Sequence, residues 1–182
     1  MLSAAGVPFT AVGAGVDEDA AKASLRHLSP RDLADALAEL KALRVSAREP
    51  GALVLGSDSL VALADGSVLD KPESPDEAAE HLRRMSGATH DLFSAAVIAE
   101  AGRPVWRVVD RARLHVRPLS PAFIDRYLDA EWPAVSACVG VFRIEGPGVQ
   151  LFSRIEGSHF TVLGLPLLPV LDQLRVRGVL PA

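Results

Sequence analysis

Serine followed directly by proline occurs three times in the chain, and each pair predicts the start of a helix. A serine at the N-cap accepts a hydrogen bond from a free backbone N–H group of the first turn, and the fixed φ of proline suits the first helical position. Apolar residues at helical spacing follow each pair. A fourth helix is expected to begin near Leu165-Pro166 and to end before Gly178. The three pairs are Ser29-Pro30, Ser74-Pro75 and Ser120-Pro121.

Runs typical of β-strands separate these helices. The short apolar run 52–55 is typical of a strand that is covered on both faces. Asp65-Gly66 favours a tight hairpin turn, and Gly102 separates two longer runs that predict antiparallel strands. Because helices alternate with strands and hairpins, we expect an α/β fold with a mixed sheet, in a single domain over residues 1–182. The other expected strands are 61–63, 68–69, 92–99, 105–116, 140–144 and 149–155.

Composition narrows the class of function. The chain has 19 basic and 23 acidic residues, a formal charge of −4 and no basic stripe, so we expect no nucleic-acid polymer as a partner. The single cysteine, Cys138, excludes a disulfide scaffold and a cysteine-based zinc site. No apolar segment has the length of a membrane span, and the first residues lack the pattern of a secretory signal. We therefore expect a cytoplasmic globular protein.

Three charged residues are candidates for chemistry. Asp58 directly follows the run 52–55, where a carboxylate can act on a ligand of an α/β sheet, although turn aspartates often only satisfy nearby backbone groups. Lys71 precedes a proline that keeps it extended, so it can contact a phosphate or remain solvated in a loop. Glu18 lies in an acidic cluster; such clusters are usually solvated, but paired carboxylates also hold Mg²⁺. The residues alone point weakly to a metal-dependent phosphate site.

Eight short motifs follow one another along nearly the whole chain. They are Gly6-Val7-Pro8-Phe9, Val16-Asp17-Glu18, Leu55-Gly56-Ser57-Asp58-Ser59, Asp70-Lys71-Pro72, Ser86-Gly87-Ala88-Thr89-His90, Glu145-Gly146-Pro147-Gly148, Arg154-Ile155-Glu156-Gly157 and Leu163-Gly164-Leu165-Pro166. In this order and spacing the chain resembles the Maf family of nucleoside triphosphate pyrophosphatases, also called septum-formation-inhibitor-like proteins.

The resemblance implies a hydrolase of nucleotide metabolism that acts on non-standard or modified nucleotides. Such an enzyme cleaves a nucleoside triphosphate between the α and β phosphates and releases a nucleoside monophosphate and pyrophosphate. The resemblance also implies the fold: an elongated mixed β-sheet flanked by helices, with two lobes around a central cleft. Family members are usually homodimers, so a homodimer is expected here as well.

By motif position, the resemblance assigns roles to particular residues. Asp58 would be the general base that activates water, close to a divalent metal cation, Mg²⁺ or Mn²⁺. Glu18 would hold the metal together with Asp58 and would also contact the substrate. Lys41, on the first long helix, and Lys71 match two lysines that contact the substrate in the family.

Two further residues bear on which base is preferred. Glu145, followed by Gly146 and Gly148, resembles the subgroup that acts on 7-methyl-GTP, and its carboxylate can accept hydrogen bonds from a guanine edge or face the methylated, cationic ring. Ser59 stands where that subgroup carries a larger amide residue, and its hydroxyl is closer to the threonine of the subgroup that acts on dTTP and UTP. Both are expected to contact the substrate, and the preferred base stays open.

The start of the chain also departs from the family pattern. Members normally begin with an apolar strand and a phosphate-binding loop that contains serine and arginine, upstream of a helix that ends at Gly6-Val7-Pro8-Phe9. The printed chain starts at Met1, which corresponds to a point inside that helix, so we expect the strand and loop to be missing, through truncation or degeneration. The alternative function is therefore a catalytically impaired nucleotide-binding protein that regulates cell division.

Overall fold

Each Ser-Pro pair begins a helix as expected. In the computed structural model, which describes residues 1–181, the hydroxyl oxygen of each of these serines accepts a hydrogen bond from the backbone N–H three residues later. The fourth predicted helix is also present, and Gly178 follows it with a φ of +70°. No helix within residues 1–181 is long and apolar enough to cross a membrane. The confirmed helices are α2 (Pro30–Ser46), α3 (Pro75–Met85), α4 (Pro121–Glu131) and α6 (Leu167–Val176).

Within the described residues, five strands form one sheet in the order β2-β1-β3-β4-β5. β1 pairs with β2, with Val61 opposite Leu69, and β4 pairs with β5, with Leu114 opposite Ile155; both pairs are antiparallel. The strands are β1 (Val54–Ala62), β2 (Val68–Leu69), β3 (Thr89–Glu100), β4 (Arg103–Val116) and β5 (Phe152–Glu156).

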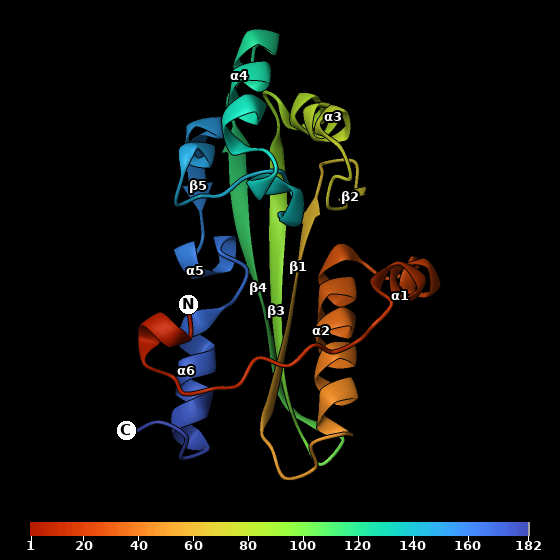
Figure 1. The fold of residues 1–182 in the computed structure, drawn as a ribbon, viewed down its shortest axis with the longest axis vertical. Helices are drawn as coiled ribbons and strands as arrows, with labels where there is room; N and C mark the ends of the chain where they lie inside the picture. The colour runs from red at the N-terminus through yellow and green to blue at the C-terminus, as the bar shows by residue number, and fades with distance from the viewer. Residues whose placement is uncertain (182) are drawn as a thin grey trace. The chain divides into compact units, whose positions relative to one another are not determined.

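Short turns join two of the neighbouring strand pairs, β1–β2 and β3–β4. Ala101 and Gly102 alone join β3 to β4, which run in opposite directions (Figure 1), and both have a positive φ, +48° and +73°. A two-residue turn of this kind follows the right-handed twist of the strands. Gly66, with a φ of +82°, lies in the turn from β1 to β2 that its sequence predicts. The α/β fold with helices flanking a sheet is confirmed, but with antiparallel neighbours where we expected a mixed sheet.

The strand β1 is longer than its sequence predicts. We expected a strand over 52–55 and then a turn, but β1 runs through the Gly56–Ser59 motif to Ala62. Glycine and aspartate are uncommon inside strands; here the side chains of Ser57, Asp58 and Ser59 find partners outside β1. The strand predicted at 140–144 does not form. Of the strand predicted at 149–155, residues 149–151 belong to a 3₁₀ helix that precedes β5.

Several short elements were not predicted. The most important is α1 (Glu18–Leu25), which begins after Asp17; the Asp17 carboxylate accepts a hydrogen bond of 2.9 Å from the backbone N–H of Ala20. This cap fixes the start of α1 and thereby the position of Glu18. The other unpredicted elements are η2 (Ala134–Ala137), η3 (Pro147–Leu151) and α5 (His159–Val162), whereas η1 (Ser3–Ala5) lies where the family resemblance implies the end of a helix.

The described chain divides into two compact units, each assembled from separate pieces of the sequence. Unit 1 contains Met1–Ser59, Phe93–Asp110 and residues 164–181, and unit 2 contains Leu60–Leu92 and Arg111–Leu163. The three long strands β1, β3 and β4 therefore contribute residues to both units. The single domain over residues 1–182 stays a prediction.

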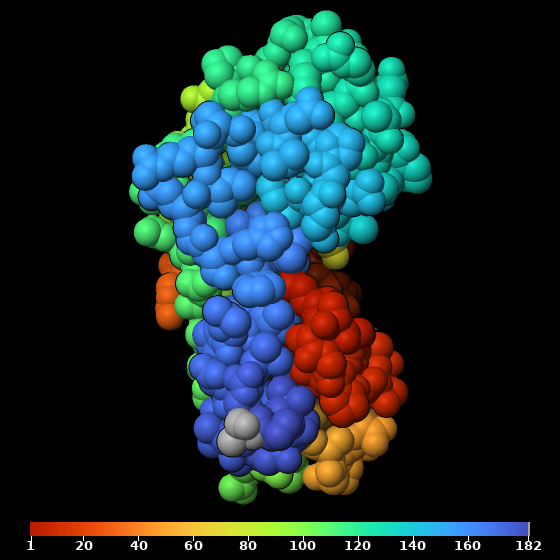
Figure 2. Space-filling model, turned by 90° about the vertical axis from the view of Figure 1, so that its left-hand side faces the viewer, coloured from red at the N-terminus to blue at the C-terminus, as the bar shows by residue number. Residues whose placement is uncertain are grey.

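Unit 1 is built around α2 and α6, which lie on either side of the strand segments of this unit (Figure 1). The N-terminal segment runs from beside α6, across the strands, to α1 (Figure 1), and Figure 2 shows its first residues, in red, packed against the C-terminal segment, in blue. Its core includes fully buried side chains from α2, β3 and α6, among them Leu37, Ala38, Ala42, Ile98 and Val170.

Unit 2 has its own apolar core, to which α3 and α4 contribute and in which they contact each other. Two polar contacts fix the segment after α4: the Tyr127 hydroxyl donates a hydrogen bond of 2.9 Å to the carbonyl of Val141, and Arg143 Nε donates one of 3.0 Å to the buried Glu131 carboxylate. His90 is 2% exposed, and neither of its ring nitrogens has a hydrogen-bond partner within residues 1–181.

Gly56 sets the distance between β1 and α2. A Cβ atom at this position would overlap the carbonyl oxygen of Ala38 and would lie 2.6 Å from the backbone nitrogen of Ala42. We predict that Gly56→Ala lowers the free energy of unfolding by about 1–3 kcal/mol, because the strand and helix must separate to accept the methyl group. Gly51→Ala is the matched control, since no atom lies within 4 Å of its added Cβ. Equal stability of the two variants in chemical denaturation would contradict this account of the packing.

Burial lowers the pKa of His90 to about 4. Between pH 6.5 and 4 the unfolded chain therefore binds a proton at this residue that the folded chain excludes, so stability falls as the pH falls through this range. We predict that the wild type loses about 3 kcal/mol relative to His90→Phe when both are unfolded by urea at pH 7.5 and at pH 4. If the difference in free energy of unfolding between the two proteins does not change with pH, His90 is protonated as readily in the folded state as in the unfolded state.

Candidate functional site

The Asp58 side chain lies on the face of β1 that packs against α2. Side chains two residues apart on a strand share a face, so Asp58 and Gly56 both face the helix. Ala38 and Lys41, three residues apart, share one face of α2. Because Gly56 carries no side chain, the strand approaches this face closely, and Asp58 is 9% exposed.

The Lys41 ammonium group lies between two carboxylates. Its Nζ atom is 2.6 Å from Oδ1 of Asp58 and 2.9 Å from Oε1 of Glu18. The side chains of Lys41, Asp58 and Glu18 are 20%, 7% and 35% exposed, so the pair with Asp58 is the more shielded of the two. Coulomb interactions strengthen as water is excluded, and Lys41 therefore binds Asp58 and Glu18 into one charged group, in which α1, α2 and β1 each supply one side chain.

The second oxygen of Asp58 is buried and unused. Within residues 1–181, Oδ2 has no hydrogen-bond partner. Burial raises the pKa of the Asp58 carboxyl above its ordinary value, and the charge of Glu18 acts in the same direction, while the hydrogen bond from Lys41 opposes both. A carboxylate with a raised pKa and a free lone pair is equipped to accept a proton.

The charge of Lys41 is secured by its neighbours. Burial by itself lowers the pKa of the ammonium, but the hydrogen bonds and charges of Asp58 and Glu18 outweigh burial and raise the pKa above its usual value. Lys41 is therefore a permanent cation at this site. Lys22, one turn after Glu18 on α1, adds a second positive charge that lowers the pKa of Asp58; no role was predicted for it from the sequence.

The carboxylates of Asp58 and Glu18 can hold Mg²⁺ or Mn²⁺ only if a bound substrate supplies further oxygen ligands. Within residues 1–181, no group of three or more histidine, cysteine, aspartate or glutamate side chains is placed to hold a metal ion. Glu18 and Asp58 are two carboxylates, and the free Oδ2 of Asp58 is one available donor. Mg²⁺ is commonly held by one or two protein carboxylates together with substrate phosphates and water, so the pair suits a cation that arrives with a phosphate chain.

Ser59 lies on the opposite face of β1 from Asp58. Its hydroxyl is 2.8 Å from the hydroxyl of Ser94 on β3 and 3.1 Å from the carbonyl oxygen of Gly164. Ser57 donates to the same carbonyl at 3.2 Å. The hydroxyl of Ser59 is thus bonded within unit 1; its expected contact with a substrate stays a prediction.

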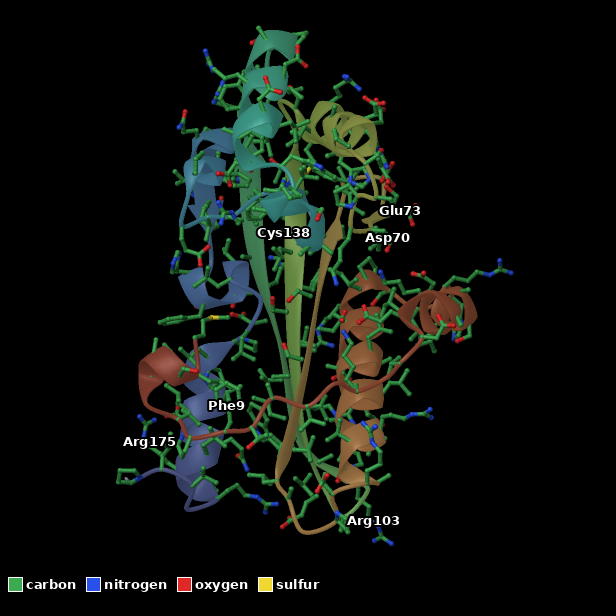
Figure 3. The ribbon with its side chains drawn as sticks, in the orientation of Figure 1. Phe9, Asp70, Glu73, Arg103, Cys138 and Arg175 are labelled. Atoms are coloured by element: carbon green, nitrogen blue, oxygen red, sulfur yellow. The ribbon has the colours of Figure 1, made fainter. Side chains whose placement is uncertain are left out.

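Lys71 and Glu145 belong to unit 2. Lys71 lies in the exposed segment between β2 and α3, beside Asp70, whose side chain Figure 3 shows next to Glu73. Burial raises the pKa of the Cys138 thiol, and the charges of Lys71 and Glu145 both act on that pKa, the first lowering it and the second raising it. Both predicted residues therefore lie in the neighbourhood of Cys138, the residue labelled in Figure 3. The predicted site residues form two groups, one in each unit.

Comparison with known proteins gives one consistent result. Residues 1–177 match the sequence model of the family described as Maf-like protein. A protein of Sphingopyxis alaskensis named nucleoside triphosphate pyrophosphatase is 52% identical over 183 residues, which cover 100% of this chain and 92% of the relative. One of Caulobacter vibrioides with the same name is 52% identical and covers 99% and 90%. A protein of Mesorhizobium japonicum named 7-methyl-GTP pyrophosphatase is 48% identical and covers 99% and 91%.

Removing the Lys41 ammonium should lower the stability of the folded protein by an amount that depends on pH. We predict that Lys41→Met lowers the free energy of unfolding by about 3 kcal/mol at pH 8, because the close cation that compensates the mutual repulsion of Asp58 and Glu18 is then lost. The loss should be smaller at pH 5, since protonation of Asp58, whose pKa is already raised, removes one charge. Chemical denaturation of Lys41→Met, Asp58→Asn and the double variant measures the coupling. Strictly additive losses would contradict the close pair.

Proposed function

The chain belongs to the Maf family, and from this premise we propose that it is a nucleoside triphosphate pyrophosphatase. It hydrolyses the linkage between the α and β phosphates of non-standard or modified nucleotides and releases a nucleoside monophosphate and pyrophosphate. The observation that carries the proposal is the free, buried Oδ2 of Asp58 beside the Lys41 ammonium. The names of the relatives support the reaction class.

Asp58 acts as the general base. Its carboxylate takes a proton from a water molecule as the water oxygen bonds to the α phosphorus, and the bond from that phosphorus to the bridging oxygen of the β phosphate breaks. Pyrophosphate leaves with the bridging oxygen. Phosphoryl transfer needs positioning and charge neutralisation more than covalent help, and a base with a pKa raised toward neutrality accepts the proton more readily than an ordinary aspartate.

Lys41 keeps Asp58 oriented and supplies positive charge. Its ammonium is shared by Asp58 and Glu18. Its three donors allow it to contact a phosphate oxygen as well. Glu18 and Asp58 would hold a divalent cation, Mg²⁺ or Mn²⁺, together with phosphate oxygens of the substrate. When bound, this cation neutralises the developing charge and lowers the pKa of the attacking water.

From the family resemblance we propose that Lys71 and Glu145 are substrate-binding residues. Lys71 offers a point charge for a phosphate. Glu145 is exposed, and its carboxylate favours a base that presents N–H donors or a positive ring, as 7-methylguanine does. One relative named 7-methyl-GTP pyrophosphatase supports this preference. We also propose, from the family resemblance, that the enzyme is a cytoplasmic homodimer.

The proposal predicts pyrophosphate release that depends on Asp58. The purified protein with Mg²⁺ or Mn²⁺ should hydrolyse at least one of 7-methyl-GTP, dTTP, UTP and the standard triphosphates. Asp58→Asn, which keeps the shape but accepts no proton, should lower kcat by about 10²–10⁴-fold with little change in nucleotide affinity. Full activity of this variant would refute the role of Asp58. Nucleotide binding without turnover by the folded wild type would instead favour the non-catalytic alternative.

A further inference from the structure

Two serines flank Asp58 and are bonded to one acceptor. Ser57 and Ser59 lie on the same face of β1, one residue before and one residue after Asp58. Both hydroxyls lie within hydrogen-bond distance of the carbonyl oxygen of Gly164, at 3.2 and 3.1 Å. A carbonyl oxygen has two lone pairs and can accept both bonds. The turn that precedes α6 thus holds β1 at two points.

The direction of these bonds follows from the acceptor. The carbonyl of Gly164 cannot donate, so the single proton of the Ser59 hydroxyl is directed to it, and Ser94 must donate the bond of 2.8 Å that joins the two hydroxyls. Ser94 is fully buried, whereas Ser57 and Ser59 are half-buried, so the bonds are partly shielded from water. Ser59 consequently has no hydroxyl proton left to donate to the nucleobase of a substrate.

Gly164 is suited to this close approach. Its φ is +99°, a conformation that favours glycine, and a Cβ atom there would lie 3.3 Å from the Ser59 hydroxyl oxygen. The segment can therefore present its carbonyl to both serines. All of these groups, together with Asp58, Lys41 and Glu18, belong to unit 1.

We propose that Ser57 and Ser59 are positioning residues that orient Asp58 through the Gly164 carbonyl. Ser59 then does not contact the nucleobase of the substrate. Successive side chains of a strand point to opposite faces, so rotation of β1 about its axis would move the Asp58 carboxylate relative to Lys41. Two bonds to one fixed carbonyl prevent that rotation. The inference rests on the proposed function for its kinetic consequence, but the two bonds themselves are independent of it.

The test compares Ser59→Ala with Ser59→Thr, which keeps the hydroxyl, and with Ser153→Ala as a matched control. Ser153 is an exposed strand serine in unit 2 whose hydroxyl also donates to a carbonyl, that of His115, at 3.2 Å. Ser59→Ala should lower kcat about tenfold, by the same factor for 7-methyl-GTP, dTTP and UTP, with KM changed less than twofold. Ser59→Thr should restore kcat to within threefold, and Ser153→Ala should match the wild type.

A double variant tests the two-point attachment. Because either serine alone still holds the carbonyl, Ser57→Ala/Ser59→Ala should lower kcat by more than the product of the single losses. Amide hydrogen exchange at residues 57–60 should rise in the double variant, and this readout does not depend on turnover. A wild type without activity would therefore refute the proposed function while the exchange data still decide the inference.

Three results would overturn the inference. The first is a change in KM or in substrate ranking for Ser59→Ala with kcat preserved, because this is the behaviour of a residue that contacts the base. The second is a double variant with wild-type kcat on a hydrolysed substrate. The third is unchanged hydrogen exchange at residues 57–60. If Ser59→Ala fails to melt cooperatively, Ser57→Ala tests the same carbonyl through the other bond.

Discussion

The close contact between β1 and α2 is the constraint on which the site depends. Only glycine at position 56 allows the strand to approach the backbone of Ala38 and Ala42. That approach brings Asp58 to 2.6 Å from Lys41, and the capped start of α1 adds Glu18 on the other side of the ammonium. A small residue in the strand therefore determines the electrostatics of a carboxylate two positions later.

In the charged group of Lys41, Asp58 and Glu18, one carboxylate oxygen of Asp58 has no hydrogen-bond partner among the described residues. Lys41 compensates one oxygen of Asp58, while the other is buried without a partner among the described residues. An unpaired buried oxygen costs free energy, and a fold optimised for stability alone would pair or remove it. Natural proteins accept such local costs at functional sites. The same burial raises the pKa of Asp58, and a raised pKa favours proton transfer to its carboxylate.

The sequence predicted the parts of the fold that local chemistry determines. Three Ser-Pro pairs located three helices, and Gly66 and Gly102 marked hairpin turns that the structure contains. It did not predict that β1 continues through residues 56–59, because Gly, Ser and Asp together are typical of a turn. The Ser and Asp side chains instead bind Lys41, Ser94 and Gly164, partners that are remote in sequence. Asp58 and Glu18 were candidates from the residues alone, and the family resemblance added Lys41; no role was predicted from the sequence for Lys22 or Ser57.

The account is tested most directly by hydrolysis in water enriched in ¹⁸O. If Asp58 activates a water molecule that attacks the α phosphorus, one ¹⁸O atom should appear in the nucleoside monophosphate, and the pyrophosphate released in the same turnover should carry none. Mass spectrometry of the two products after a single turnover distinguishes the positions. Label in the pyrophosphate would place the attack on the β phosphorus, and release of orthophosphate would mean a different bond is cleaved. Either result would contradict the proposed reaction at Asp58.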